Sequence, residues 1–65
     1  MKLQLNGIAI DTDVTTLAAL LDEQGFAEAK VATAVNGEFV PEALRTAQIL
    51  DEGDLIEVLA PMQGG

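Results

Sequence analysis

The sequence predicts an α+β fold in which a mixed sheet of about five strands carries one main helix on one of its faces. Three observations support this prediction. Two segments of β-type sequence are each interrupted by an Asn-Gly pair, at Asn6-Gly7 and at Asn36-Gly37. A segment between them has the leucine spacing of a helix, and a strongly apolar run at residues 55–59 lies near the end of the chain.

The first ten residues are expected to form a hairpin. Residues 2–5 alternate polar and apolar, and residues 8–10 resume the apolar pattern after Asn6-Gly7. Asn-Gly is a strong hairpin signal because both residues tolerate positive φ. We expect one face of this hairpin to be dry and to consist of Leu3, Leu5, Ile8 and Ile10.

A helix is expected to follow this hairpin. Leu17, Leu20 and Leu21 fall on one helical face. Asp13, Thr15 or Thr16 can cap the start of the helix, and Gly25 supplies a C-terminal stop. The sequence therefore predicts one short helix with a leucine stripe that packs on the sheet.

A second hairpin is expected from residues 31–40. Residues 31–35 are rich in β-branched side chains, and Asn36-Gly37 supplies the turn into residues 38–40. Pro41 ends the returning strand because proline cannot donate to a strand ladder.

The remaining segments complete the sheet. Residues 42–50 are ambiguous, although a short helical turn around Ala43-Leu44 is favoured over a long helix. A turn at residues 52–54 leads into the apolar run 55–59, which we expect to be central, between the two hairpins. Hairpin, helix, hairpin and central last strand is the order of the β-grasp, or ubiquitin-like, architecture. We assign residues 1–60 to this domain and residues 61–65 to a flexible tail ending in Gly-Gly.

Composition excludes several classes of function. Eleven Asp and Glu against three Lys and Arg give a net charge of −8, which disfavours binding to nucleic acid. The acid excess serves either solubility alone or steering toward a basic partner, and the adjacent Asp22 and Glu23 are interpreted as a solvated face. Neither a signal peptide nor an apolar run of membrane-spanning length is recognisable, so we expect a cytoplasmic protein without membrane contact.

Candidate chemistry is concentrated at the C-terminus. The chain has no Cys, His, Tyr or Trp, so no nucleophile-base pair and no metal site is predicted. Gly64 and Gly65 form an end without side chains, which can thread a narrow channel and expose the carboxyl carbon to attack after adenylation. The alternative is that these two glycines are simply a frayed terminus.

A docking surface is predicted on the last strand. Its four apolar side chains cannot all point to one side in a strand of period two. We therefore expect Leu55 and Leu59, with Phe39 nearby, to form an exposed patch for a partner. In the alternative, residues 42–50 cover that side of the sheet.

Five segments in this order and spacing are similar to those of one known family: KLQLNG at 2–7, TLAALL at 16–21, VATAVNGEFVP at 31–41, EGD at 52–54 and GG at 64–65. In these segments the chain resembles the ThiS-type sulfur carriers of thiamine biosynthesis. The resemblance extends over essentially the whole chain.

The resemblance implies that the chain is a protein co-substrate and not a catalyst. A ThiF-type adenylyltransferase would use ATP and magnesium to convert the Gly65 carboxylate into an acyl adenylate. Sulfur from cysteine, delivered as a desulfurase persulfide, would then give a thiocarboxylate, and a ThiG-type thiazole synthase would receive that sulfur. Partners would recognise the tail at Gly64, Gln63 and Met62, and the chain itself would bind no cofactor.

Three other functions stay open. The small subunit of molybdopterin synthase resembles this chain in fold and tail, although the short chain and residues 35–41 favour the thiamine carrier. A ubiquitin-like modifier would form an isopeptide bond with lysines instead of a thiocarboxylate. A passive β-grasp interaction module would not need a free terminus.

Overall fold

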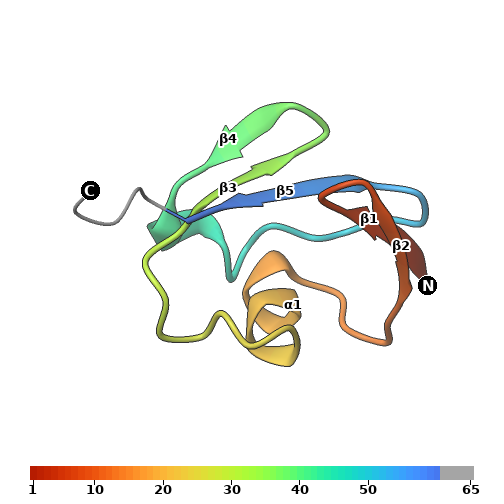
Figure 1. Cartoon of the computed structure of the whole chain (residues 1–65), viewed down its shortest axis with the longest axis horizontal. Coiled ribbons are helices and arrows are strands. Elements are labelled where there is room, and N and C mark those ends of the chain that lie inside the picture. Colours follow the sequence, from red (N-terminus) through yellow and green to blue (C-terminus); the bar gives the residue numbers. More distant parts are fainter. Residues whose placement is uncertain (61–65) are drawn as a thin grey trace.

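One five-stranded mixed sheet and one α-helix make up the computed structural model, which describes residues 1–60 (Figure 1). The fold is the predicted β-grasp. The predicted tail, residues 61–65, lies outside the described residues, so the domain boundary stays a prediction. The elements in chain order are β1 (Lys2–Leu5), β2 (Ile8–Asp11), α1 (Leu17–Glu23), β3 (Ala32–Val35), β4 (Glu38–Val40), the 3₁₀ helix η1 (Glu42–Leu44) and β5 (Leu55–Leu59).

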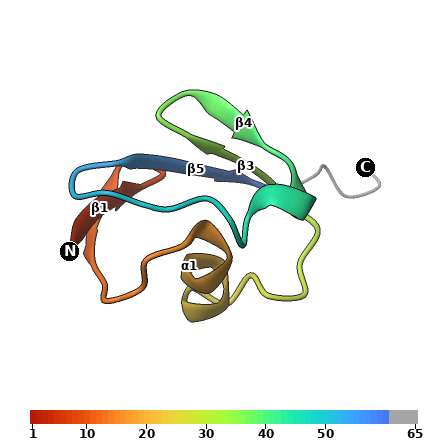
Figure 2. The same ribbon diagram turned by 180° about the vertical axis from the view of Figure 1, so that it is seen from behind.

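The last strand lies in the centre of the sheet. The strand order is β2-β1-β5-β3-β4, and β5 runs parallel to β1 and antiparallel to β3. Figure 2 shows from behind how β5 lies between the two hairpins, with α1 on one side of the sheet. The predicted insertion of the last strand is therefore confirmed.

Both Asn-Gly pairs form the tight turns that the sequence predicts. Asn6 and Gly7 have φ values of 51° and 82°, and Asn36 and Gly37 have 53° and 85°. Two successive positive φ values twist the turn in the same sense as the strands that it joins. Each hairpin register is fixed by these turns.

The helix begins and ends at the predicted signals. The Oγ1 atom of Thr16 accepts a hydrogen bond from the Ala19 N–H at 3.2 Å, and Gly25 follows the helix with φ 89°. The helical leucine stripe is buried against the sheet. With seven residues α1 is short, and no helix within residues 1–60 has the length and hydropathy needed to cross a membrane.

The core is aliphatic and lies between α1 and the sheet. One predicted member, Ile8, is not part of it: its exposed fraction is 69%. The prediction was wrong because β2 is an edge strand, so Ile8 has a neighbouring strand on one side only. The buried core residues are Leu3, Leu17, Leu20, Leu21, Val35, Val40, Leu50, Ile56 and Val58.

The ambiguous segment 42–50 supplies acceptors to the start of α1. It opens with the predicted short helical turn, η1, and continues without regular structure. The Leu17 N–H donates to the Gln48 carbonyl and the Ala18 N–H to the Arg45 carbonyl, both at 3.0 Å. The first N–H groups of a helix lack partners within the helix, so this segment satisfies two of them.

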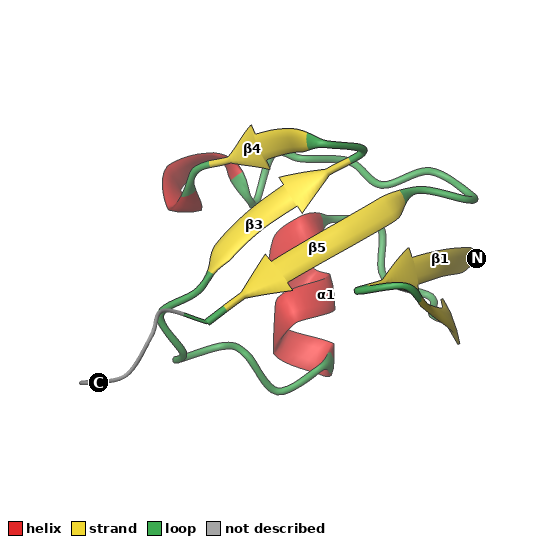
Figure 3. Cartoon of the chain, turned by 45° about the horizontal axis from the view of Figure 1, so that its top comes forward, coloured by secondary structure: helices red, strands yellow, loops and turns green. Residues whose placement is uncertain are grey.

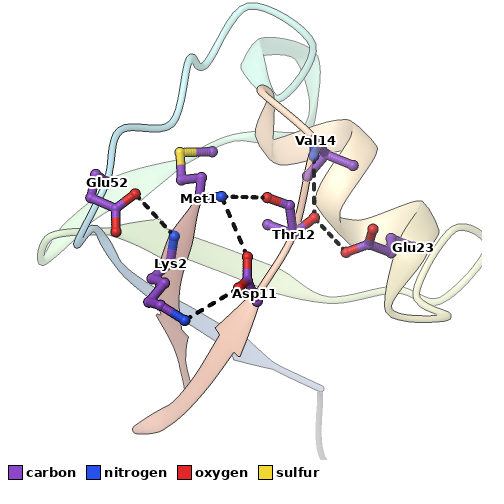
Figure 4. A network of polar contacts seen from close by, with 7 residues as sticks. All are labelled: Met1, Lys2, Asp11, Thr12, Val14, Glu23 and Glu52. Atoms are coloured by element: carbon purple, nitrogen blue, oxygen red, sulfur yellow. Dashed lines mark hydrogen bonds and ion pairs between the residues drawn. The ribbon is translucent and has the colours of Figure 1, made fainter.

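A polar network joins the two ends of the first hairpin (Figure 4). The Met1 amine lies 3.4 Å from Asp11 Oδ1, and Lys2 Nζ lies 3.2 Å from Asp11 Oδ2. Thr12 Oγ1 donates to Glu23 at 2.6 Å. Glu23 is exposed, but the interpretation of its carboxylate as purely solvated was wrong, because it holds the hairpin to the end of α1.

Stability should depend on the charge of Asp11. The hydrogen bond from Lys2, followed by that from the Met1 amine, lowers the pKa of Asp11 below its ordinary value. A lowered folded-state pKa means that the contribution to stability is present above the unfolded-state pKa and is lost as the pH falls through the folded-state pKa. Wild type should therefore exceed Asp11→Asn in unfolding free energy near neutral pH, and the difference should vanish as the pH falls below about 4.

Urea denaturation over a pH series measures this difference. Asp13→Asn is the control for loss of one negative charge, because Asp13 is exposed and lies outside the network. A gap between wild type and Asp11→Asn that persists undiminished in acid would contradict the expectation.

Candidate functional site

The described part of the site is the end of β5 and the sheet face around it. β5 ends at Leu59, whose partner in the register is Ala32 of β3. The predicted tail residues follow in the chain and lie outside the described residues, so their roles stay predictions: Met62, Gln63, Gly64 and Gly65.

Two asparagine side chains hold β5 where backbone partners are lacking. Asn6 Nδ2 donates to the Val58 carbonyl at 3.1 Å, and Asn6 Oδ1 accepts from the Val58 N–H at 2.8 Å. On the side of β5 that faces β1, the Asn6 side chain thus supplies hydrogen bonds beyond the last residue of β1. At the other end of β5, Asn36 Oδ1 accepts from the Leu55 N–H at 2.9 Å. The two turns therefore position β5 as well as reverse the chain.

β5 presents different residues to its two sides. Ile56 and Val58 are buried in the core, whereas Leu55, Glu57 and Leu59 are exposed on the face turned away from α1. Period-two alternation produces this division. The inference that the four apolar residues of this strand cannot all point inward is confirmed.

We call this side of the sheet the outer face. Phe39 and Leu59 are its most exposed large apolar side chains, at 69% and 70%, and they line a shallow hollow together with Ala32 and Ala34. Leu55, 49% exposed, lines a neighbouring hollow nearer to the turns. The outer face consists of Gln4, Ala32, Ala34, Phe39, Leu55, Glu57 and Leu59.

The structure thus brings together Phe39 and Leu59, two of the residues predicted for docking, and places Leu55 further along the same face. Their docking role stays a prediction. Contiguous exposed apolar surface on a small protein is typical of an interaction site. Figure 3 views the sheet with α1 behind it and shows β3 and β5 side by side on this face.

The alternative in which residues 42–50 cover the outer face is wrong. Leu50 is buried in the core beside the helical leucines, and Ile49 forms a bridge with Thr16 at the start of α1. The segment lies on the helix side of the sheet, where its carbonyl groups accept hydrogen bonds from the first N–H groups of α1. The outer face is accordingly left open within residues 1–60.

Arg45 fixes the strand that borders the end of β5. Its Nε donates to Thr33 Oγ1 at 3.1 Å and its Nη2 to the Val31 carbonyl at 2.6 Å. Thr33 Oγ1 donates in turn to the Val40 carbonyl at 2.8 Å. These bonds satisfy a buried hydroxyl and tie the start of β3 to the chain after η1.

Sequence reasoning missed four residues of the outer face, one of which is Gln4, the partner of Leu55 in the register between β1 and β5. Ala32, Ala34 and Glu57 join it through the register that pairs Ala34 with both Phe39 and Glu57. Alternation within each strand was visible in the sequence. The pairing between strands was needed to show that these residues are neighbours.

The described residues are better suited to binding a partner than to carrying out chemistry. Within residues 1–60, no three acidic side chains gather where they could hold a metal ion. The outer face is suited to association with a partner surface, and its apolar border reaches Leu59, six residues before Gly65. Six extended residues span at most about 20 Å.

Comparison of the sequence and the structure with known proteins points to one family. The model of the ThiS family matches residues 3–65. A crystal structure of the thiamine biosynthesis protein ThiS from Geobacter metallireducens is 30% identical, with a TM-score of 0.85 and full coverage of both chains. A solution structure of a thiamine biosynthesis protein from the same organism is 29% identical, with a TM-score of 0.79, and the match covers all of this chain and 88% of that one. The search of curated proteins gave no match.

Proposed function

Because this chain belongs to the ThiS family of small sulfur carrier proteins, we propose that it carries sulfur for thiazole formation in thiamine biosynthesis, as a thiocarboxylate on Gly65. The observation that carries this proposal is the family match through residue 65, which includes the Gly64-Gly65 end. The open outer face supports it, since a carrier must associate with the enzymes that load and unload it.

The proposed cycle begins with activation by a ThiF-type adenylyltransferase. The Gly65 carboxylate attacks the α-phosphorus of magnesium-bound ATP, and pyrophosphate leaves to give an acyl adenylate. A persulfide sulfur then attacks the acyl carbon and displaces AMP, and reductive cleavage of the resulting acyl disulfide by a thiol leaves the thiocarboxylate. Glycine at both terminal positions leaves the acyl carbon unhindered.

Delivery of the sulfur completes the cycle. A ThiG-type thiazole synthase receives the sulfur, an oxygen from the sulfur-accepting substrate or from water replaces it on the acyl carbon, and the carrier returns with its carboxylate. The carrier supplies no catalytic residue in this scheme. Its contribution is to bind each enzyme in turn and to present the terminus within the reach that the six residues after Leu59 allow.

A mass measurement tests the proposal. The intact chain is incubated with the adenylyltransferase encoded in the same genome, ATP, magnesium, a cysteine desulfurase, cysteine and a thiol reductant. The chain should gain the mass difference between sulfur and oxygen, and only when ATP and cysteine are both present. Conjugation to lysines of other proteins would instead favour a modifier, and an unchanged mass would overturn the carrier assignment.

The outer face should contribute to binding of the adenylyltransferase. Leu59→Asp places a charge where we expect apolar contact, and should weaken binding by more than about 1 kcal/mol if Leu59 is an interface hot spot. Titration calorimetry or surface plasmon resonance with the enzyme measures the change.

The matched control is Ile8→Asp. Ile8 is as exposed as Leu59 but belongs to the edge strand β2 and to the other side of the sheet. Equal affinities of the enzyme for wild type and for a folded Leu59→Asp variant would show that Leu59 and the outer face around it are not part of the interface.

A further inference from the structure

We propose that the Glu57 carboxylate is a specificity-determining group, which selects an adenylyltransferase that presents an arginine or lysine to the centre of the outer face. This inference rests on the proposed function and names the chemistry that its partner must offer. Glu57 is a charged residue on a face otherwise dominated by apolar side chains.

Glu57 occupies the middle of the outer face. It lies between Leu55 and Leu59 on the exposed side of β5, and its partner across to β3 is Ala34. Ala34 is small and pairs with Phe39 on its other side. Glu57 lines both hollows of the face, the one near Leu55 and the one that Phe39 and Leu59 share.

A partner that fills both hollows must therefore cover Glu57. Burial of an ionised carboxylate without a compensating charge or hydrogen bonds is strongly unfavourable. An apolar partner surface would incur this cost in full. A guanidinium or ammonium group opposite Glu57 would remove it, and arginine can pair with a carboxylate through two parallel hydrogen bonds.

Among the described residues, 1–60, no basic group forms an ion pair with Glu57. Within residues 1–60 the ion pairs are confined to Asp11 with Lys2 and with the Met1 amine. Arg45 donates to Thr33 and Val31. The net charge of −8 also favours a partner with positive potential. Glu57 is thus the charge that such a partner meets at the centre of its contact.

A second copy of this chain fits the face poorly. A two-fold interface uses the same patch on both subunits, so pairing through the outer face would bring two Glu57 carboxylates toward each other. Like charges facing each other across an interface are costly. A basic partner protein therefore fits the outer face better than a second copy, and the adenylyltransferase is that partner because it must act first on the carboxylate terminus.

The test compares two charge-neutralising variants. Glu57→Gln keeps the shape of the side chain and removes its charge. Glu28→Gln makes the same change in net charge in the loop after α1, at an exposed position outside the outer face. Steady-state adenylation is followed as pyrophosphate release, with the carrier as the varied substrate, and urea denaturation verifies that both variants are folded.

Glu57→Gln should raise the KM for the carrier about tenfold or more, because it leaves the basic group of the enzyme without its partner, while kcat at saturation stays the same. Glu28→Gln should change the KM less than about twofold, as expected for a charge outside the contact. An acidic replacement of the matching enzyme arginine or lysine should impair wild type and be rescued by Glu57→Lys.

Three results would overturn the inference. Equal KM increases in the two variants would mean that only net charge matters, and a lower KM for Glu57→Gln would mean that the carboxylate opposes docking. An effect confined to the thiazole synthase step would assign Glu57 to the other enzyme. Each of these leaves the proposed function standing if wild type is adenylated, whereas wild type that is never adenylated would overturn the proposed function itself.

Discussion

Deletion of Gly65 is expected to abolish thiocarboxylate formation and to leave the free energy of unfolding within about 0.5 kcal/mol of wild type. The chemical reason is that the terminal carboxylate of Gly65 is the proposed acceptor of sulfur. The structural reason is that the buried core of residues 1–60 begins at Leu3 and ends at Val58, well before the glycine pair. Mass spectrometry after the loading reaction measures the first effect, and urea denaturation measures the second.

Two further variants sharpen this test. An added residue after Gly65 keeps the glycine pair but moves the carboxylate, and should also abolish loading. Gly64→Leu keeps the terminal carboxylate and should impair loading less completely, because a side chain hinders passage through a narrow channel. Thiazole formation by the Gly65 deletion would refute the proposed role of this residue.

Ile56→Ala is expected to remove most of the stability of the domain. Ile56 lies on the central strand with only 1% of its surface exposed, and truncation of a buried isoleucine costs about 2–5 kcal/mol. A core of this size supplies roughly 3–5 kcal/mol, and the chain has no cysteine for a disulfide. Unfolding should therefore begin without added denaturant, as followed by far-UV circular dichroism.

Leu59→Ala is the matched control on the same strand. Leu59 is 70% exposed, so its truncation should change the unfolding free energy by less than about 0.5 kcal/mol. Similar losses in the two variants would contradict the division of β5 into a buried and an exposed side.

Much of the fold could be predicted because its signals are local. The Asn-Gly turns, the leucine stripe of α1 and the apolar run of β5 each depend on a few neighbouring residues. The strand order followed from the hydropathy of β5, since a strand that is apolar at most positions is favoured in the centre of a sheet.

The parts that could not be predicted depend on pairs distant in the sequence. The bonds of Asn6 to Val58 join residues near opposite ends of the chain, and a turn signal alone does not indicate them. The central place of Glu57 on the outer face likewise required the register between β3, β4 and β5. Ile8 is a further example. The alternation of polar and apolar residues in its hairpin was recognised, but alternation alone did not reveal that β2 lies at the edge of the sheet.

The candidate site was predictable to a similar extent. Leu59 was named from the period of two in the last strand, Phe39 was expected nearby, and the structure places both on one hollow. The chemistry assigned to Gly65 came from the family resemblance and from the properties of glycine. Gly65 lies outside the described residues, so its role stays a prediction.

The central position of β5 also has a consequence for synthesis of the chain on the ribosome. β1 contacts β5 across about fifty residues of sequence, as in the pair of Gln4 with Leu55. Contacts of such long range form late in folding, because the intervening loop must first be closed. The two hairpins have no direct strand pairing with each other within residues 1–60, and in the sheet they are joined through β5. A nascent chain that ends before residue 55 should therefore remain open to proteolysis, and protection should appear only when β5 has emerged, just ahead of the glycine pair on which the proposed sulfur is carried.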